Sequence, residues 1–357
     1  VPFYKDSFQR ENVSPQDLKT LEDIQRFPIL TKADIQENQE RLLSGQYSKA
    51  ELLQDSSGGS TGKPTVFYKD LQYNQLRAAD QIRHDRWSGW DIGDPYALVW
   101  GAQKDLSAFQ SLKQKLVTRY IHRVYPLDAF DMTEEKICQY IVVLEKLQPP
   151  MILGYANALY VFAQYLNQSK INHKIRPKGV ISSAETLAEY KRVEIEKAFK
   201  CPVLNRYGSR EVGLMASECT HGSGLHINAD NVYLEISNGG VAAPFGESGD
   251  VLVTDFLNKG MPFIRYQMGD RASMKEEGCK CGRGLPLLNE VEGRTSDFLV
   301  AENGTLVHGE YFTHMFYGEG SEKPLFHLQE EHQVSFQEWV APHHFALHTA
   351  VPCTASL

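Results

Sequence analysis

Asp55-Ser56-Ser57-Gly58-Gly59-Ser60-Thr61-Gly62-Lys63-Pro64 is the stretch from which the fold can be inferred. Glycines permit positive φ, so consecutive backbone N–H groups can point into one concavity, while hydroxyl and ammonium groups add further donors. The stretch therefore predicts a loop that holds a phosphate chain, and its run into the strand-like Thr65–Tyr68 favours this over the alternative of a flexible Gly/Ser linker.

The loop differs from the Walker A pattern at two positions. Ser57 stands where that pattern requires its first glycine, and Pro64 replaces the hydroxyl residue that would hold Mg²⁺. Proline also disfavours helical geometry in the residue before it, so Lys63 is expected to be extended. We therefore expect the loop to join two extended segments rather than a strand and a helix.

Ser57–Pro64 resembles the phosphate loop of the adenylate-forming enzymes, S-S-G-[ST]-T-G-x-P, with one extra glycine. The spelling is most similar to that of the phenylacetate–coenzyme A ligase and CapK branch. The resemblance implies that the loop binds ATP or AMP and that Lys63 takes part in catalysis. The loop residues implied to bind the nucleotide are Ser57, Gly58, Gly59, Ser60, Thr61 and Gly62.

Two segments later in the chain resemble the family's adenine-site motifs. Tyr207–Glu211 is similar to Y-G-x-[ST]-E, except that Arg210 stands at the usual hydroxyl position. The resemblance implies that Tyr207, Gly208 and Ser209 bind the nucleotide and that Glu211 is a catalytic Mg²⁺ ligand. Ser183, Ala184 and Glu185 resemble the segment whose backbone lines adenine and the acyl pocket. As bare sequence, both segments also fit simple turns after strands.

The remaining family motifs follow in the same order as in the family. Pro262–Asp270 resembles the segment that ends in R-Y-x-x-G-D, which implies that Asp270 binds the ribose hydroxyls. Gly293–Asp297 resembles G-R-x-x-D, which implies that Arg294 contacts ribose or phosphate and that Asp297 forms a hinge. Each motif alone is weak evidence, but four in family order are unlikely to arise by chance.

Cysteine and histidine residues outside these motifs predict a metal site. Cys279 and Cys281 form a C-x-C pair, and Cys219 lies some sixty residues earlier. With His226 they would make a closed tetrahedral Zn²⁺ site of structural type, as similar cysteines in the CapK branch also imply. His221 is the alternative fourth ligand, and the competing interpretation is reduced structural cysteines.

The pattern of elements predicts an α/β fold. Strand-like segments near 96–100, 151–154, 179–182 and 201–205 alternate with helical ones, which indicates a parallel layer, and antiparallel strands follow from about 225. The expected organisation is a large adenylate-forming domain over residues 1–297 and an incomplete or atypical small C-terminal domain over 298–357. Helices are expected from Ser14 to about Arg26, and from a capping box at Thr186 to Phe199.

Composition limits the classes of partner. The chain has 357 residues and a net charge of −8, which argues against nonspecific nucleic-acid binding, and no apolar run is long enough to span a bilayer. The scattered cysteines and the lack of a signal peptide indicate a cytoplasmic protein. A homodimer is a further expectation.

The function implied by the resemblance is activation of a small carboxylic acid by ATP and Mg²⁺ to acyl-AMP, followed by thioester formation with coenzyme A. A role in polysaccharide biosynthesis is implied by the CapK likeness. No clear counterpart of the family's C-terminal lysine is found, so one alternative is a catalytically impaired nucleotide-binding homologue with a scaffold or accessory role. A third interpretation is a zinc-dependent enzyme. Candidates for the acyl pocket are Trp87, Trp100, Tyr155 and Phe162, although core packing explains such aromatic residues equally well.

Overall fold

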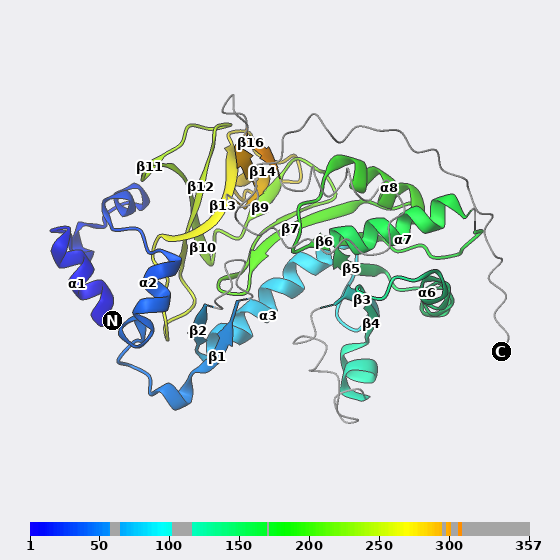
Figure 1. Ribbon diagram of the computed structural model, residues 1–357, viewed down its shortest axis with the longest axis horizontal. Coiled ribbons are helices and arrows are strands. Elements are labelled where there is room, and N and C mark those ends of the chain that lie inside the picture. The colour runs from blue at the N-terminus through cyan, green and yellow to red at the C-terminus, as the bar shows by residue number, and fades with distance from the viewer. Residues whose placement is uncertain (58–64, 102–115, 170, 295–297, 301–305, 309–357) are drawn as a thin grey trace, which may run out of the picture. The chain divides into compact units, whose positions relative to one another are not determined.

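The computed structural model describes residues 1–57, 65–101, 116–169, 171–294, 298–300 and 306–308 (Figure 1). The chain divides into two compact units, Val1–Thr295 and Ser296–Leu357. In the second unit the described residues form an antiparallel pair of strands, β15 (Phe298–Val300) and β16 (Leu306–His308). The domain boundary expected after residue 297 remains a prediction, and the unit Val1–Thr295 is considered below.

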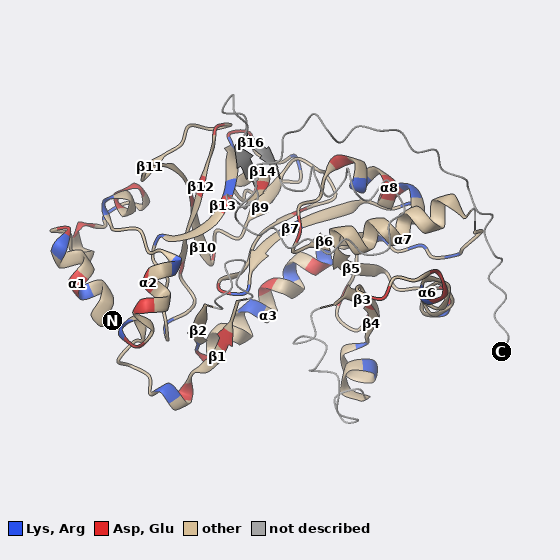
Figure 2. Cartoon of the chain, in the orientation of Figure 1, with Lys and Arg blue, Asp and Glu red and all other residues tan. Residues whose placement is uncertain are grey.

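Six α-helices are described in the first unit. They are α1 (Pro2–Arg10), α2 (Lys32–Glu37), α3 (Leu71–Asp85), α6 (Glu134–Leu147), α7 (Ala156–Gln168) and α8 (Glu189–Phe199). Short helical segments of other types cover Pro15–Asp17, Leu21–Arg26, Gln39–Leu42, Lys49–Glu51, Arg86–Ser88 and Val117–His122. Acidic and basic residues alternate along α3 (Figure 2). No described helix is long and apolar enough to cross a bilayer.

Within the described residues, twelve strands form one mixed sheet in the order β11-β10-β12-β13-β14-β9-β8-β7-β6-β5-β3-β4. The strands are β3 (Tyr96–Trp100), β4 (Val124–Asp128), β5 (Met151–Tyr155), β6 (Gly179–Ser183), β7 (Val203–Ser209), β8 (Gly213–Glu218), β9 (Leu225–Ile227), β10 (Val232–Asn238), β11 (Val241–Ala242), β12 (Ser248–Asp255), β13 (Tyr266–Lys275) and β14 (Leu287–Arg294). The five strands β3, β4, β5, β6 and β7 run parallel to one another. The pairing of β7 with β8, and every further pairing toward β11, is antiparallel. This confirms the predicted α/β fold with a parallel layer and an antiparallel β region.

The parallel half of the sheet is covered on both faces because its strand residues alternate. Ile152 and Val180 point into an apolar cluster with α6, α7 and α8. Their neighbours Met151 and Ile181 point the other way, into a cluster with Trp90. Residues two apart in a strand share a face, so burial on both faces requires continuous apolar strands, as parallel sheets typically show.

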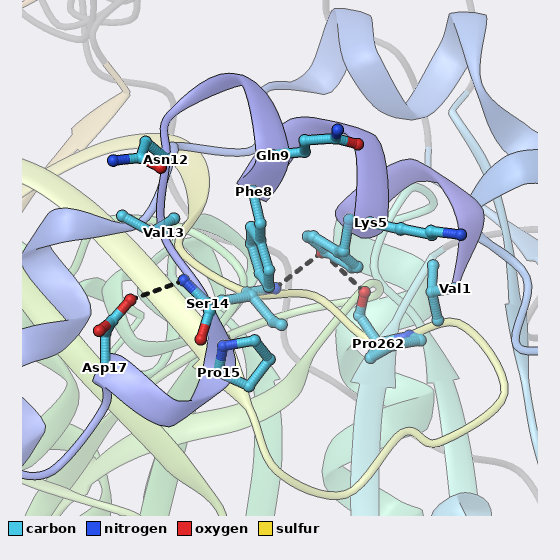
Figure 3. A pocket seen from close by; sticks show the side chains of 12 residues that line it. Val1, Lys5, Phe8, Gln9, Asn12, Val13, Ser14, Pro15, Asp17 and Pro262 are labelled. Atoms are coloured by element: carbon cyan, nitrogen blue, oxygen red, sulfur yellow. Dashed lines mark hydrogen bonds between the residues drawn. The ribbon is translucent and has the colours of Figure 1, made fainter.

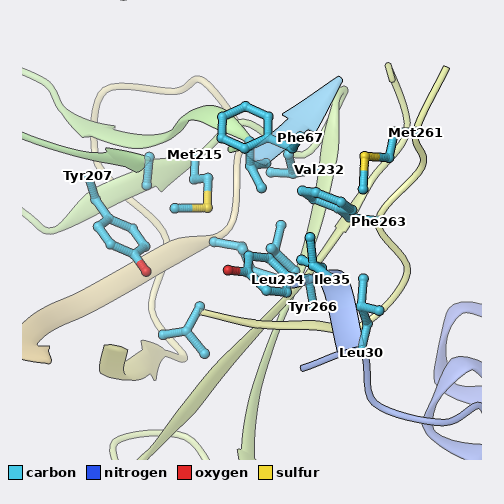
Figure 4. Packing of buried hydrophobic residues seen from close by; sticks show 14 of the residues in the cluster. Leu30, Ile35, Phe67, Tyr207, Met215, Val232, Leu234, Met261, Phe263 and Tyr266 are labelled. Carbon is cyan, nitrogen blue, oxygen red and sulfur yellow. The ribbon is translucent and has the colours of Figure 1, made fainter. Parts of the chain in front are cut away.

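The N-terminal segment packs on the antiparallel half through a larger apolar cluster. Figure 4 shows Leu30 and Ile35 among Phe67, Phe263 and Tyr266. Arg265 locks this junction: it is 2% exposed, ion-paired with Glu235 at 3.0 Å, and donates to the carbonyls of Gln25 and Phe27. A buried guanidinium that is paired and hydrogen-bonded in this way fixes the position of the N-terminal segment on the sheet. Arg265, the arginine of the R-Y-x-x-G-D segment, therefore has a structural role.

A cavity of about 780 Å³ lies between α1 and the segment around Pro262 (Figure 3). The Tyr4 hydroxyl at its wall donates to the Pro262 carbonyl at 2.9 Å and accepts from the Ile264 N–H at 3.0 Å. None of the predicted site residues lines this cavity, so it belongs to the N-terminal packing.

One helix prediction is wrong, and a second helix is confirmed with a later start. The segment from Ser14 to Arg26 forms two short 3₁₀ turns, because Ser14 closes a capping box with Asp17 and Thr20 closes a second with Asp23. The second box begins a new turn before the first can propagate. The helix expected from Thr186 begins only at Glu189, with Ala188 as its N-cap residue.

Candidate active site

The predicted phosphate loop is the tip of a β-hairpin. Strand β1 (Leu53–Ser56) pairs antiparallel with β2 (Val66–Lys69), and the Ser57 N–H donates to the Thr65 carbonyl at 3.0 Å. This confirms that the loop joins two extended segments. Ser57 Oγ is buried and has no hydrogen-bond partner among the described residues. Gly58, Gly59, Ser60, Thr61, Gly62 and Lys63 lie outside the described residues.

A buried lysine stands at the base of this hairpin. Lys69 Nζ lies 2.8 Å from Asp55 Oδ2, and Asp55 Oδ1 accepts from the Ser56 N–H at 2.8 Å. Burial lowers the pKa of Lys69, the nearby Arg77 cation lowers it further, and the carboxylates of Asp55 and Glu211 oppose both. The base of the loop and the Glu211 carboxylate therefore share one electrostatic environment.

Two of the predicted nucleotide residues meet directly. The Tyr207 hydroxyl lies 2.8 Å from Asp270 Oδ2, and Asp270 pairs with Arg294 across strands β13 and β14. The intervening strands bend enough to bring β7 and β13 together, although three other strands separate them in the sheet. Gly269 has a φ of +78°, a conformation that suits glycine immediately before the carboxylate. Figure 4 shows Tyr207 beside Met215 at the margin of the apolar cluster.

Residues 210–212 form the turn that carries Glu211 between β7 and β8. A Cβ on Gly208 would lie 2.5 Å from the Gly213 carbonyl, so the close approach of the two strands requires glycine at position 208. Ser209 Oγ accepts from the Val212 N–H at 3.1 Å. Glu211 is 9% exposed. The turn lies where the sheet changes from parallel to antiparallel, next to the carboxyl ends at which open α/β sheets bind ligands.

The segment after β6 lies at the same edge. Ser183 ends the strand and Ala184 has a φ of +69°, which is uncommon for a residue with a Cβ and is typical of functional turns. Glu185 Oε2 accepts from the Asn157 N–H at 2.7 Å, at the start of α7. A carboxylate at a helix N-terminus is favourable, so this contact by itself gives Glu185 a structural explanation.

The predicted metal ligands are gathered in one cluster: Cys219, His226, Cys279 and Cys281 have ligand atoms within 4.8 Å of one another. Cys219 Sγ lies 3.7 Å from Cys279 Sγ and 3.3 Å from His226 Nε2, and Cys281 Sγ lies 3.4 Å from His226 Nε2. Three thiol groups and one imidazole are the donor set and spacing of a closed tetrahedral site. His221 Nδ1 is 3.9 Å from Cys219 Sγ and is not among the four.

Aromatic and cationic side chains surround the metal cluster. The Trp87 ring lies 5.4 Å from the His226 ring and 4.2 Å from that of His84, and the Arg283 guanidinium covers Trp87 at 4.5 Å. Burial lowers the pKa of His84 to about 3, assisted by the Arg206 cation, so this imidazole is neutral at pH 7. The Trp87 ring therefore packs beside the metal cluster, and its place in an acyl pocket stays a prediction.

The other aromatic candidates separate into two environments. Phe162 is fully buried among α7, α8 and the parallel strands, so it is a core residue. Trp100 and Tyr155 end the neighbouring strands β3 and β5, with ring centroids 4.1 Å apart. They alone of the four stand at the carboxyl edge of the sheet, where an acyl pocket would have to lie.

For Arg294 the structure gives only the backbone position, and Asp297 lies outside the described residues. The motif analysis missed Lys69, Tyr73 and Arg77, which lie close to the Glu211 turn. The Tyr73 hydroxyl donates to the Val212 carbonyl at 2.7 Å and Arg77 to that of Arg210 at 3.3 Å. Lys69 ends strand β2, and the sequence around Tyr73 and Arg77 shows only an ordinary amphipathic helix start.

Comparison of the sequence with known proteins shows which of them it resembles. No protein-family model matches the chain. Protein CapK of Staphylococcus aureus is 28% identical over 315 residues, which cover 85% of this chain and 66% of CapK. Phenylacetate–coenzyme A ligases of Aromatoleum evansii and Escherichia coli are 25% and 27% identical, each over 84% of this chain. The chain is therefore similar in sequence to CapK and to phenylacetate–coenzyme A ligases over most of its length.

Solved structures agree on the adenylate-forming fold. 2-Hydroxyisobutyryl-CoA ligase, in complex with an acyl-adenylate in its postadenylation state, superposes with a TM-score of 0.71 at 20% identity over 86% of this chain and 66% of the ligase. O-succinylbenzoate coenzyme A synthetase from Bacillus subtilis, in complex with AMP, gives 0.52 at 14% identity over 74% of this chain and 54% of the synthetase. The chain spans about two thirds of the length of the curated relatives that it matches.

A buried acid near the site predicts a pH effect on folding. Asp255 is 6% exposed, and burial raises its pKa to about 6, while its Oδ1 accepts from the Leu257 N–H. A raised folded-state pKa stabilises the fold below the unfolded value near 4, and that stability is lost as the pH rises through 6. We expect Asp255→Asn to gain about 1 kcal/mol relative to wild type between pH 5 and 7 in urea unfolding. An unchanged difference across that range would contradict the prediction.

Proposed function

We propose that this chain activates a small carboxylic acid with ATP to acyl-AMP and pyrophosphate, and then transfers the acyl group to coenzyme A. The observation that carries the proposal is the contact between Tyr207 and Asp270, beside the Arg294 backbone, in a chain similar in sequence to known ligases. The named relatives include phenylacetate–coenzyme A ligases, and acyl-adenylate and coenzyme A are bound in a solved structure of 2-hydroxyisobutyryl-CoA ligase.

The proposed roles follow from the chemistry of each side chain. Asp270 would accept hydrogen bonds from both ribose hydroxyls, while the Tyr207 ring would lie against adenine. Ser57, Gly58, Gly59, Ser60, Thr61 and Gly62 would donate to the phosphates, and Lys63 and Arg294 would neutralise phosphate charge. Ser183, Ala184, Glu185, Gly208, Ser209 and Asp297 would complete the nucleotide and hinge contacts.

The acid oxygen would attack the α-phosphorus as pyrophosphate leaves, so the barrier depends on neutralising negative charge at the phosphates. Glu211 would hold Mg²⁺, and the ion would supply positive charge that offsets the negative charge of the phosphates and of the departing pyrophosphate. The sulfur of coenzyme A would then attack the acyl carbon and release AMP. No covalent intermediate with the protein is required.

We also propose that Cys219, His226, Cys279 and Cys281 hold a structural Zn²⁺ ion. Four protein ligands leave no open position for a substrate, which supports a structural ion over a zinc-dependent enzyme. The free thiols in this cluster fit a reducing compartment, so a cytoplasmic location is part of the proposal. A homodimer and a role in polysaccharide biosynthesis stay proposals drawn from the sequence.

The test is pyrophosphate release across a panel of carboxylic acids, with ATP binding measured by calorimetry. Release that depends on both the acid and Mg²⁺ supports the ligase. Binding of ATP without release would instead identify the impaired nucleotide-binding homologue. If the protein neither binds ATP nor releases pyrophosphate, both hypotheses are refuted.

Asp270→Asn is expected to weaken ATP binding by about 10- to 100-fold, because hydrogen bonds to a charged group contribute about 1.5–3 kcal/mol. The matched control is Glu290→Gln, which neutralises an exposed carboxylate on the neighbouring strand β14. Calorimetric titration of ATP into the three proteins measures the effect. Equal affinities for wild type and Asp270→Asn would remove Asp270 from the ribose site.

A further inference from the structure

The start of α3 is bonded to the turn that carries Glu211. Three consecutive carbonyl groups of the turn, those of Arg210, Glu211 and Val212, accept from two α3 side chains. Arg77 donates to the first at 3.3 Å, and the Tyr73 hydroxyl lies 3.2 Å from the second and 2.7 Å from the third. Of the two carbonyls that the Tyr73 hydroxyl faces, Val212 is the nearer acceptor and Glu211 the weaker one.

The Tyr73 side chain is held in a buried environment, next to the Asp255 carboxylate as well as the turn carbonyls. Tyr73 is fully buried, and its position on α3 is fixed because Asp70 caps the helix by accepting from the Tyr73 N–H at 2.8 Å. Asp70 also accepts from the Lys259 N–H at 3.0 Å, which ties the helix start to the antiparallel half of the molecule. A buried donor held in this way fixes the carbonyls that it faces.

Arg77 bonds to the carbonyl of Arg210, the residue before Glu211, and so supports the turn on its other side. Its guanidinium lies 5.3 Å from the centre of the Tyr73 ring, close enough for a cation–π contact. Gly213, which follows the turn, has a φ of +93°, and a Cβ there would lie 2.4 Å from Arg77 Nε. The glycine lets the turn approach Arg77 this closely.

We propose that Tyr73 and Arg77 are positioning residues for the Glu211 carboxylate. This rests on the proposed function, in which Glu211 holds Mg²⁺ with the phosphates of ATP. Metal ligands must be held within about 0.5 Å of the productive geometry, and the backbone on both sides of Glu211 is anchored only if these carbonyls stay bonded. Neither residue contacts substrate in this role.

The test compares Tyr73→Phe with a matched control, Tyr4→Phe. Both variants remove one buried hydroxyl that donates to a backbone carbonyl, but Tyr4 bonds to Pro262 in the N-terminal packing. ATP binding is titrated by calorimetry over a range of Mg²⁺ concentrations and again in EDTA. We expect Tyr73→Phe to raise the Mg²⁺ concentration for half-maximal ATP binding about tenfold, with affinity in EDTA unchanged.

The control and a second variant make the result specific. Tyr4→Phe should lower the thermal unfolding midpoint by a similar amount and leave the Mg²⁺ dependence unchanged. Arg77→Lys keeps the charge but loses the planar donor, and it should shift the Mg²⁺ dependence in the same direction by about threefold.

The possible failures are distinguishable. If wild type binds ATP in a Mg²⁺-dependent way and Tyr73→Phe shows the same dependence, the positioning role is overturned and the proposed function stands. An equal shift in Tyr4→Phe would also overturn it, since the effect would then follow stability alone. If wild type shows no Mg²⁺-dependent binding, both proposals fall.

Discussion

Glu211→Gln is expected to slow Mg²⁺-dependent pyrophosphate release by at least about 100-fold, because a neutral amide is a poor ligand for a hard divalent cation. Glutamine keeps the size of the side chain, and the turn stays bonded through its carbonyls to Tyr73 and Arg77. The fold should therefore persist, and the loss should appear in the rate rather than in the unfolding midpoint.

The rate is measured under saturating ATP while the Mg²⁺ concentration is varied. Glu247→Gln, which changes an exposed glutamate in the turn between β11 and β12, is the control and should behave as wild type. A Glu211→Gln protein that retains the full rate at ordinary Mg²⁺ concentrations would show that the metal is held without this carboxylate.

Removal of the metal is expected to have the largest effect on stability. Structural zinc sites in small domains contribute about 10 kcal/mol or more, so even half of that would lower the unfolding midpoint by about 7 °C in a chain of this size. The purified protein should contain one zinc ion per chain by elemental analysis. Chelation or Cys281→Ser should remove the ion and produce the drop.

Cys201→Ser is the matched control, because Cys201 is a free cysteine outside the metal cluster. It should keep the full metal content. A cobalt-substituted protein with four protein ligands should give a tetrahedral spectrum that ATP and acids do not alter. Wild-type protein that is metal-free and equally stable would eliminate the site.

Much of the site could be predicted because its signals are local. The hairpin at Ser57 follows from glycine, hydroxyl and proline chemistry, and β5 and β6 follow from short apolar runs between helices. The convergence of Tyr207 and Asp270 came from a family resemblance, since no periodicity encodes a contact between residues 63 positions apart. The same holds for Cys219 and Cys279, which are 60 positions apart.

What the sequence did not reveal depends on long-range geometry or on competition between local signals. The bond from Tyr73 to Val212 spans 139 positions, and its helix has the same pattern as any surface helix. Strand β4 was missed because Pro126 interrupts its apolar run, which an edge strand tolerates. The Ser14–Arg26 prediction failed because two capping boxes competed within ten residues.

Strand β9 has a consequence for how the molecule comes apart. Among the described residues, β9 (Leu225–Ile227) is the strand that joins β8 to β14 in the sheet, and it pairs with β8 at three positions and with β14 at two. His226, the middle residue, is one of the four clustered metal ligands. An ion bound there would hold β9 to the segment that carries Cys279 and Cys281, next to the short pairing of β9 with β14. Loss of the ion is therefore expected to weaken the pairing of β9 first, in the part of the sheet between the strands that carry Tyr207 and Asp270.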